Sequence, residues 1–303
     1  MPAISNKSGI DNSSDSAGRP REVSMQSNTA TSDAKVERVI RTHWRFSTAA
    51  VSKGAALLIH GLNLKPGAMA AISRRLSAAG IDVLQVTLSG HDTKSLSDME
   101  RIEEFRRASY TLWRSEVAAA YVELADYAND HQLPKYLVAY SIGALLGADL
   151  LIDAEPAVAY DKMVLLSPAL SLRATSQLLR PFSLFPDLIM PSFSPSVYHA
   201  NWGTPMAAYN ALYDGLHHFE KGASNQLNIP SLIVIDKGDE LVSAHGIEGF
   251  IESHQLTQWQ FSTVRKGSDA MTWYHHLLID ELTLGRAAWN DMMQQIEDFL
   301  LQD

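Results

Sequence analysis

The pentapeptide at 139–143 (AYSIG) is the part of this sequence where chemistry is easiest to place. It follows an apolar run at 135–138 that predicts a buried strand and precedes a run at 144–151 that predicts a helix. A serine on such a turn, with very small residues two positions away on each side, has the form of a nucleophile elbow. The helix behind Ser141 would direct N–H groups and the positive end of its dipole toward a developing oxyanion. The structural alternative is that Ser141 only caps this helix.

A serine nucleophile needs a base, and the candidates follow two later strands. The next predicted apolar strands of the core end in Asp236 and Asp239, and in His275 and His276 after a loop. A serine hydroxyl is almost un-ionised at neutral pH, so a histidine must take its proton, and a carboxylate must orient that histidine. Ligands of open parallel sheets bind beyond the carboxyl ends of the strands, where all these residues fall. The pattern therefore predicts serine, acid and histidine in that chain order.

The elements that must position these residues alternate between strand and helix. The hydrophobic pattern predicts an α/β fold with a doubly wound, mostly parallel sheet. We expect a half-exposed edge strand at 39–46, buried strands at 55–59, 81–88, 135–138 and 163–166, and two further strands at 231–235 and 259–264. We expect helices at 68–79, 97–129 and 144–151, and a last helix whose inner face carries Trp289, Met292, Met293, Ile296 and Phe299.

The domain organisation follows from the segments that lack this alternation of strands and helices. Residues 1–34 are polar and contain almost no large apolar side chains, which predicts a disordered tail before a domain at 35–303. Residues 169–227 contain many prolines and aromatics without a strand signal, which predicts a largely helical cap inserted over the strand ends. We expect most of these aromatics to form the insertion's own core and a minority to line a pocket.

Composition narrows the classes of protein. The 303 residues carry a net charge of −9 without a basic block, which argues against nucleic acid and anionic membranes as partners. The chain has no cysteine, so disulfides and thiolate chemistry are excluded. No signal-peptide pattern and no membrane-spanning run occur, so we expect a cytoplasmic protein without stable membrane insertion. The histidine spacing does not match a metal motif, and we expect no cofactor and no metal.

Four motifs together resemble the α/β-hydrolase superfamily, with the capped carboxylesterases, monoacylglycerol lipases and lysophospholipases as the most similar members. The resemblance covers about residues 36–302. It is carried by His60-Gly61, by Gly90-His91, by the pentapeptide at 139–143, in which Ala139 stands where the family usually has glycine, and by the acid loop Asp239-Glu240-Leu241-Val242.

The resemblance implies a role for each of these residues. Ser141 would be the nucleophile and Asp239 the acid, with Asp236 the second choice and Glu240 pointing away. His276 would be the base, with His275 as the alternative.

The resemblance also implies an oxyanion hole and its supports. The donors would be the N–H groups of Leu62 and Ile142, and His60, Gly61 and Gly143 would shape the surrounding loops. Gly90-His91 would shape the loop beneath the pocket.

The expected activity is cleavage of a carboxylic ester through an acyl-enzyme, with a small-molecule or lipid-like ester as substrate. A thioesterase or an amide or peptide hydrolase would use the same three residues. A binding protein that retained the fold without the chemistry is the alternative from another class. The oligomeric state and the substrate are not determined by the sequence.

Overall fold

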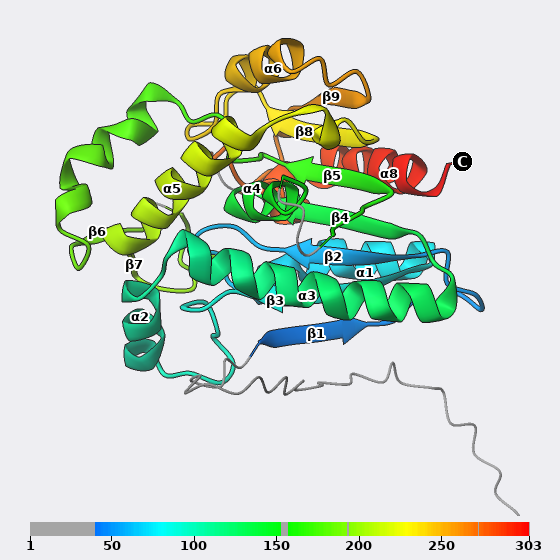
Figure 1. The fold of residues 1–303 in the computed structure, drawn as a ribbon, viewed down its shortest axis with the longest axis horizontal. Coiled ribbons are helices and arrows are strands. Elements are labelled where there is room, and N and C mark those ends of the chain that lie inside the picture. Colours follow the sequence, from blue (N-terminus) through cyan, green and yellow to red (C-terminus); the bar gives the residue numbers. More distant parts are fainter. Residues whose placement is uncertain (1–39, 153–156, 193, 272, 303) are drawn as a thin grey trace, which may run out of the picture.

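A single mixed sheet organises the molecule (Figure 1). The computed structural model describes residues 40–152, 157–192, 194–271 and 273–302. Within these residues, seven strands form the main sheet in the order β1-β3-β2-β4-β5-β8-β9, and only the edge strand β1 runs antiparallel to its neighbour. The strands are β1 (Arg41–Arg45), β2 (Gly54–Ile59), β3 (Ile81–Thr87), β4 (Lys135–Tyr140), β5 (Lys162–Leu166), β8 (Ser231–Asp236) and β9 (Trp259–Val264). The predicted α/β architecture, with its edge strand and buried parallel strands, is confirmed.

Helices cover both faces of this sheet. The helices of the described chain are α1 (Ala70–Ala79), α2 (Asp98–Arg106), α3 (Tyr110–His131), α4 (Ile142–Asp149), α5 (Met206–Gly222), α6 (Ala244–Ser253), α7 (Glu281–Leu284) and α8 (Arg286–Leu301), and the short 3₁₀ turn η1 (Pro66–Met69) leads into α1. In Figure 1, α3 lies in front of the sheet and α1 behind it. Accordingly, one buried cluster joins the sheet to α3, α4 and α5, and a second joins it to α1 and α8. The loops that follow β2, β4 and β8 leave the sheet between the helices of its two faces.

The predicted helix at 97–129 is wrong in one respect, because the structure has two helices there. Ser97 forms the expected capping box with Glu100 at the start of α2. The chain then leaves the helix at Arg107, and Ser109 begins α3 by accepting a hydrogen bond from the N–H of Leu112. A serine side chain that caps a new helix competes with helix continuation, which is the physical reason for the break.

The insertion between β5 and β8 contains more than helix. It includes the 3₁₀ segment η2 (Ala174–Leu184), the helix α5, the short 3₁₀ turn η3 (Asn225–Leu227), and a two-stranded antiparallel sheet of β6 (Ile189–Pro191) and β7 (Gly203–Pro205). The insertion that the sequence predicts to be largely helical therefore also contains two short strands, for which the sequence shows no signal. Strands of three residues, each ending in proline, are too short to produce an alternating pattern.

The aromatics of the insertion do not all form its core. Tyr198 and Phe219 are buried, and Tyr209 lines a pocket. By contrast, Phe182 and Phe185 are exposed. The expectation that most of these rings pack inside the insertion is wrong for the η2 region.

Two sequence expectations concern other parts of the chain. The tail predicted at 1–34 and the first residues of the domain lie outside the described residues. No helix in the described part of the chain combines the length and apolar character needed to cross a bilayer.

Gly143 is the glycine that allows α4 to start directly behind β4. A Cβ at this position would lie 2.5 Å from the carbonyl oxygen of His60 and 2.8 Å from that of Ile59. Backbone atoms of a buried strand cannot move aside as a flexible side chain can, so the elbow and β2 can approach this closely only with glycine at 143.

We therefore expect Gly143→Ala to lower the free energy of unfolding by about 1–3 kcal/mol, because a methyl group overpacks this contact. Gly249 in α6 is the matched control, since it is exposed and a Cβ there meets no atom within 4 Å. Gly249→Ala should raise stability by about 0.5–1 kcal/mol. Urea titrations of both variants measure this, and a Gly143→Ala protein as stable as the wild type would contradict the close contact.

Candidate active site

Ser141 occupies a strained turn between β4 and α4. Its backbone has φ 56° and ψ −120°, a conformation rarely adopted by residues other than glycine. Such a residue costs about 1–3 kcal/mol and persists only where its surroundings impose it. Here the N–H of Ser141 donates to the carbonyl of Leu166 at 2.9 Å, and its own carbonyl accepts the N–H of Ala169 at 3.1 Å. The strand β5 and the segment after it therefore hold the serine in this position.

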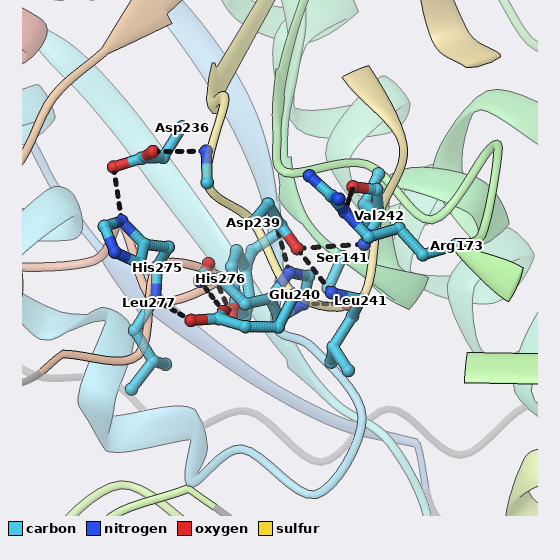
Figure 2. Close-up of polar contacts among 12 residues, drawn as sticks. Ser141, Arg173, Asp236, Asp239, Glu240, Leu241, Val242, His275, His276 and Leu277 are labelled. Atoms are coloured by element: carbon cyan, nitrogen blue, oxygen red, sulfur yellow. Dashed lines mark hydrogen bonds and ion pairs between the residues drawn. The ribbon is translucent and has the colours of Figure 1, made fainter. Parts of the chain in front are cut away.

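A continuous hydrogen-bonded chain joins Ser141, His276 and Asp239 (Figure 2). The Nε2 atom of His276 lies 2.9 Å from the Ser141 Oγ, and its Nδ1 lies 2.8 Å from the Asp239 Oδ2. The three side chains come from the β4–α4 turn, the segment between β9 and α7, and the loop after β8. All three are buried. This geometry leaves Nε2 free to accept the serine proton, provided that Nδ1 carries the other proton.

The second histidine and the second acid form a separate pair. His275 Nδ1 lies 2.9 Å from Asp236 Oδ2, and Figure 2 shows this pair pointing away from Ser141. The side chain of His275 is 40% exposed, whereas that of His276 is 6% exposed. Asp236 also accepts the N–H of Gly238 at 2.7 Å and so shapes the loop between the two acids. The structure thus brings Asp239 and His276 to the serine, and keeps Asp236 and His275 apart from it.

Asp239 is held in the ionised form. Burial raises the pKa of Asp239. The neighbouring His276 and the N–H groups of Val242 and Leu241 lower it by more than burial raises it, so the pKa of Asp239 lies below its usual value. Those two N–H groups each donate to Oδ1 at 2.9 Å, which leaves Oδ2 for His276. A buried carboxylate with this set of donors keeps its charge and its orientation.

The backbone of His276 is held as firmly as its ring. Glu240 accepts the N–H of His275 at 3.0 Å and that of His276 at 3.1 Å, one on each carboxylate oxygen. The hydroxyl of Tyr140 donates to the carbonyl of His276 at 3.0 Å, and burial raises the Tyr140 pKa well above its usual value, so it remains a donor. Sequence reasoning placed Glu240 outside the site, because only the folded loop shows which way its side chain turns.

The loop after β2 forms a tight turn against the serine. The N–H of Leu64 donates to the carbonyl of Gly61 at 3.2 Å, which places Leu62 and Asn63 at the centre of the turn. A Cβ at Gly61 would lie 2.6 Å from the Tyr140 ring and 3.1 Å from the Ser141 Cβ, so only glycine permits this approach. Leu62 and Ile142 both line the pocket that contains Ser141. The N–H of Ile142 belongs to the first turn of α4, where N–H groups have no partner within the helix.

Two buried neutral histidines support this turn from behind. His60 accepts the N–H of Leu88 at Nε2 (3.1 Å), and His91 accepts the N–H of Asn63 at Nε2 (2.9 Å). Burial lowers the pKa of His60 to about 4 and lowers that of His91 well below its usual value. Both rings must be neutral, because a protonated Nε2 could not accept these hydrogen bonds. The Gly90-His91 motif therefore acts on the loop after β2 through one side-chain acceptor.

The serine opens into an apolar pocket of about 600 Å³ below the insertion. Aliphatic side chains dominate its wall, with hydroxyl-bearing residues on the side of the insertion. Among the described lining residues, Glu240 is the only one with a charged carboxylate, and none is lysine or arginine. No group of three or more histidine, aspartate or glutamate side chains in the described chain is arranged to hold a metal ion. The pocket thus favours an uncharged ligand with an apolar part.

The parallel sheet, the serine on a strand-to-helix elbow after β4, and the loops that converge on it define an α/β hydrolase. A family model described as "Serine aminopeptidase, S33" matches residues 50–204, which contain β2 to β6 and the elbow. The chain belongs to this family.

Solved structures agree on the fold. A monoglyceride lipase from Saccharomyces cerevisiae superposes with a TM-score of 0.69 at 11% identity, over 92% of this chain and 95% of that one. A monoacylglycerol lipase from Paleococcus ferrophilus gives 0.62 at 12% identity over 87% and 99%. A carboxyl esterase from Bacillus coagulans gives 0.61 at 12% identity over 92% and 97%. Comparison with curated protein sequences gives no match. At these identities, the likeness shows the fold.

The neutral state of His60 makes stability depend on pH. An unfolded histidine takes up a proton near pH 6.5, whereas native His60 remains neutral down to about pH 4. The unfolded state therefore binds more protons between these values, and stability must fall as the pH is lowered from about 6.5 to 4. One such group lowers the free energy of unfolding by about 1.4 kcal/mol for each pH unit of acidification in this window.

Replacing His60 removes this contribution. His60→Gln is expected to be less stable than the wild type at pH 7 but to lose stability less steeply between pH 6.5 and 4.5. His245→Gln, which replaces a side chain that is 99% exposed, is the matched control and should keep the wild-type slope. Urea unfolding at several pH values measures the slopes, and equal slopes for all three proteins would refute the buried neutral assignment.

Proposed function

We propose that this protein is a serine hydrolase that cleaves carboxylic esters through an acyl-enzyme intermediate. The observation that carries the proposal is the hydrogen-bonded chain from Ser141 through His276 to Asp239, of which Ser141 and His276 line an apolar pocket. Two further features support it, namely the strained elbow and the position of Leu62 and Ile142 in the wall of the pocket that contains Ser141. In this proposal, Ser141 is the nucleophile, His276 the general base and Asp239 the acid.

The mechanism follows from the positions of these groups. The Ser141 oxygen attacks the ester carbonyl while its proton passes to His276 Nε2, and the imidazolium formed is stabilised by Asp239. The carbonyl oxygen becomes an oxyanion that the N–H groups of Leu62 and Ile142 stabilise. His276 then protonates the leaving alcohol, and the same ring activates the water that releases the acid and restores Ser141.

The pocket favours an uncharged ester with a medium or long acyl chain. Its wall is mostly aliphatic. Glu240 would repel an anionic substrate, and the described lining residues include no lysine or arginine that could offset this repulsion. The solved structures named above are described as lipases and an esterase, which agrees with this class. A thioester bearing several phosphates would meet no complementary charge, which favours an ester over that alternative.

The roles of the paired acids and histidines can be tested by matched variants. Asp239→Asn and His276→Ala are expected to lower kcat by about 10³-fold or more, because the base loses its orientation or is absent. Asp236→Asn and His275→Ala remove the neighbouring pair and should leave kcat close to wild type. Steady-state assays with p-nitrophenyl esters measure this, and the reverse ranking would transfer the roles to His275 and Asp236.

The substrate class can be tested with the purified protein. We expect burst release of p-nitrophenol and labelling of Ser141 by an uncharged fluorophosphonate, with both lost in Ser141→Ala. From acetate to octanoate esters, kcat/KM should rise by up to about fourfold per methylene, because each buried CH₂ contributes roughly 0.8 kcal/mol.

Matched thioesters and aminoacyl amides complete this comparison. Faster turnover of either than of the ester would assign the protein to that class instead. Tight binding without turnover or labelling would identify a binding protein, and labelling that persists in Ser141→Ala would remove the nucleophile assignment.

A further inference from the structure

Every polar atom of Asn63 is engaged in a hydrogen bond. Its N–H donates to His91 Nε2 at 2.9 Å, and its carbonyl accepts the N–H of Ala200 at 2.8 Å. Its side-chain amide pairs with the backbone of Asn201 in both directions, because Nδ2 donates to the carbonyl at 3.0 Å and Oδ1 accepts the N–H at 2.8 Å. Asn63 and Asn201 are 138 residues apart in the chain and almost completely buried. A reciprocal pair of this kind fixes two backbones relative to each other.

Residues 198–201 of the insertion, here called the brace, form the other side of this contact. The brace runs antiparallel to the loop after β2, with a bridge between Leu64 and His199 and a bond from the N–H of Lys65 to the carbonyl of Tyr198 at 2.8 Å. These contacts align the brace with the turn that carries Leu62.

The brace is itself anchored to the core. The buried Arg101 of α2 donates through Nε to the Ala200 carbonyl at 2.9 Å and to Asn201 Oδ1 at 3.1 Å. The Asn201 amide donates to the carbonyl of Gly90 at 2.8 Å. At its other end, the Tyr198 hydroxyl donates to Asp280, which begins α7 just after the segment that carries His276. The brace therefore joins the loops around Leu62 and His276 to the body of the domain.

We propose that Asn63 is a positioning residue that sets the Leu62 N–H for the oxyanion by tying its turn to the brace. Asn63 has φ 53° at the third position of the turn, where asparagine and glycine are the favoured residues. Backbone preference alone would be met by glycine, so the two side-chain bonds are what asparagine adds. The inference rests on the proposed function, because Leu62 matters only if an oxyanion forms.

Asn63→Gly provides the test, because glycine adopts the same φ and removes only the amide. The expected result is a fall in kcat of about 10-fold or more with KM within about twofold, since an oxyanion donor acts in the transition state and not in the bound substrate. The rate of reaction with an uncharged fluorophosphonate, whose phosphoryl oxygen takes the oxyanion position, should fall in parallel.

Two further variants separate positioning from stability. Gln132→Gly at the C-cap of α3 replaces another residue with positive φ (56°) far from the site, and it should leave kcat and labelling rate unchanged. Asn63→Asp keeps the size and the turn preference of the side chain, but it replaces the Nδ2 donor with an oxygen that repels the Asn201 carbonyl. It should lower kcat in the same way even if Asn63→Gly folds poorly, which thermal unfolding reports.

The outcomes distinguish this inference from the function on which it rests. If the wild type turns over no ester, thioester or amide, the proposed function fails. If the wild type is active and folded Asn63→Gly or Asn63→Asp retains the wild-type kcat and labelling rate, only the positioning role fails. A loss confined to KM or to the melting temperature would likewise overturn it and leave Asn63 a purely structural residue.

Discussion

The site depends on the backbone of Ser141, which is held at positive φ between β4 and α4. This conformation is unfavourable for serine in isolation, so the surrounding chain must supply the compensation. Close packing does this from two sides, since β5 accepts the serine N–H and the loop after β2 approaches so closely that Gly61 and Gly143 can carry no side chain. Ser141 and Ile142, the first residue of α4, both line the pocket, and the acid and histidine loops meet the elbow there.

Convergence is achieved by burying polar groups in defined charge states. The Asp239 carboxylate remains ionised although burial opposes its charge, because His276 and two backbone N–H groups stabilise it. His60 and His91 remain neutral because burial disfavours their charged forms, and each then accepts a backbone N–H. Glu240 supplies an acceptor to the backbone N–H groups of both neighbouring histidines. A buried polar group without its partner is costly, so each of these contacts rigidifies the loop that contains it.

The insertion has two different relations to the site. Its beginning is bound to the acid loop, since the N–H of Arg173 and the hydroxyl of Ser176 both donate to the carbonyl of Leu241, and residues 198–201 are bound to the loop after β2. These parts belong to the framework of the pocket. In contrast, the part of η2 after Ser176 exposes Leu178, Phe182 and Leu184, although Leu178 also lines the pocket. No residue of η2 is buried, although four of its residues line the pocket.

Local sequence patterns predicted the seven strands of the main sheet, the elbow at Ser141 and the loops that carry Asp239 and His276. Apolar runs and turn residues act over a few positions, so these features can be predicted locally. Only long-range packing explains the break before Ser109, the short strands β6 and β7, the contacts of Glu240 and Asn63, and the placement of His276 and not its neighbour His275 against Ser141. Adjacent residues of a loop share the same local sequence signal, and only long-range packing determines which of them turns toward Ser141.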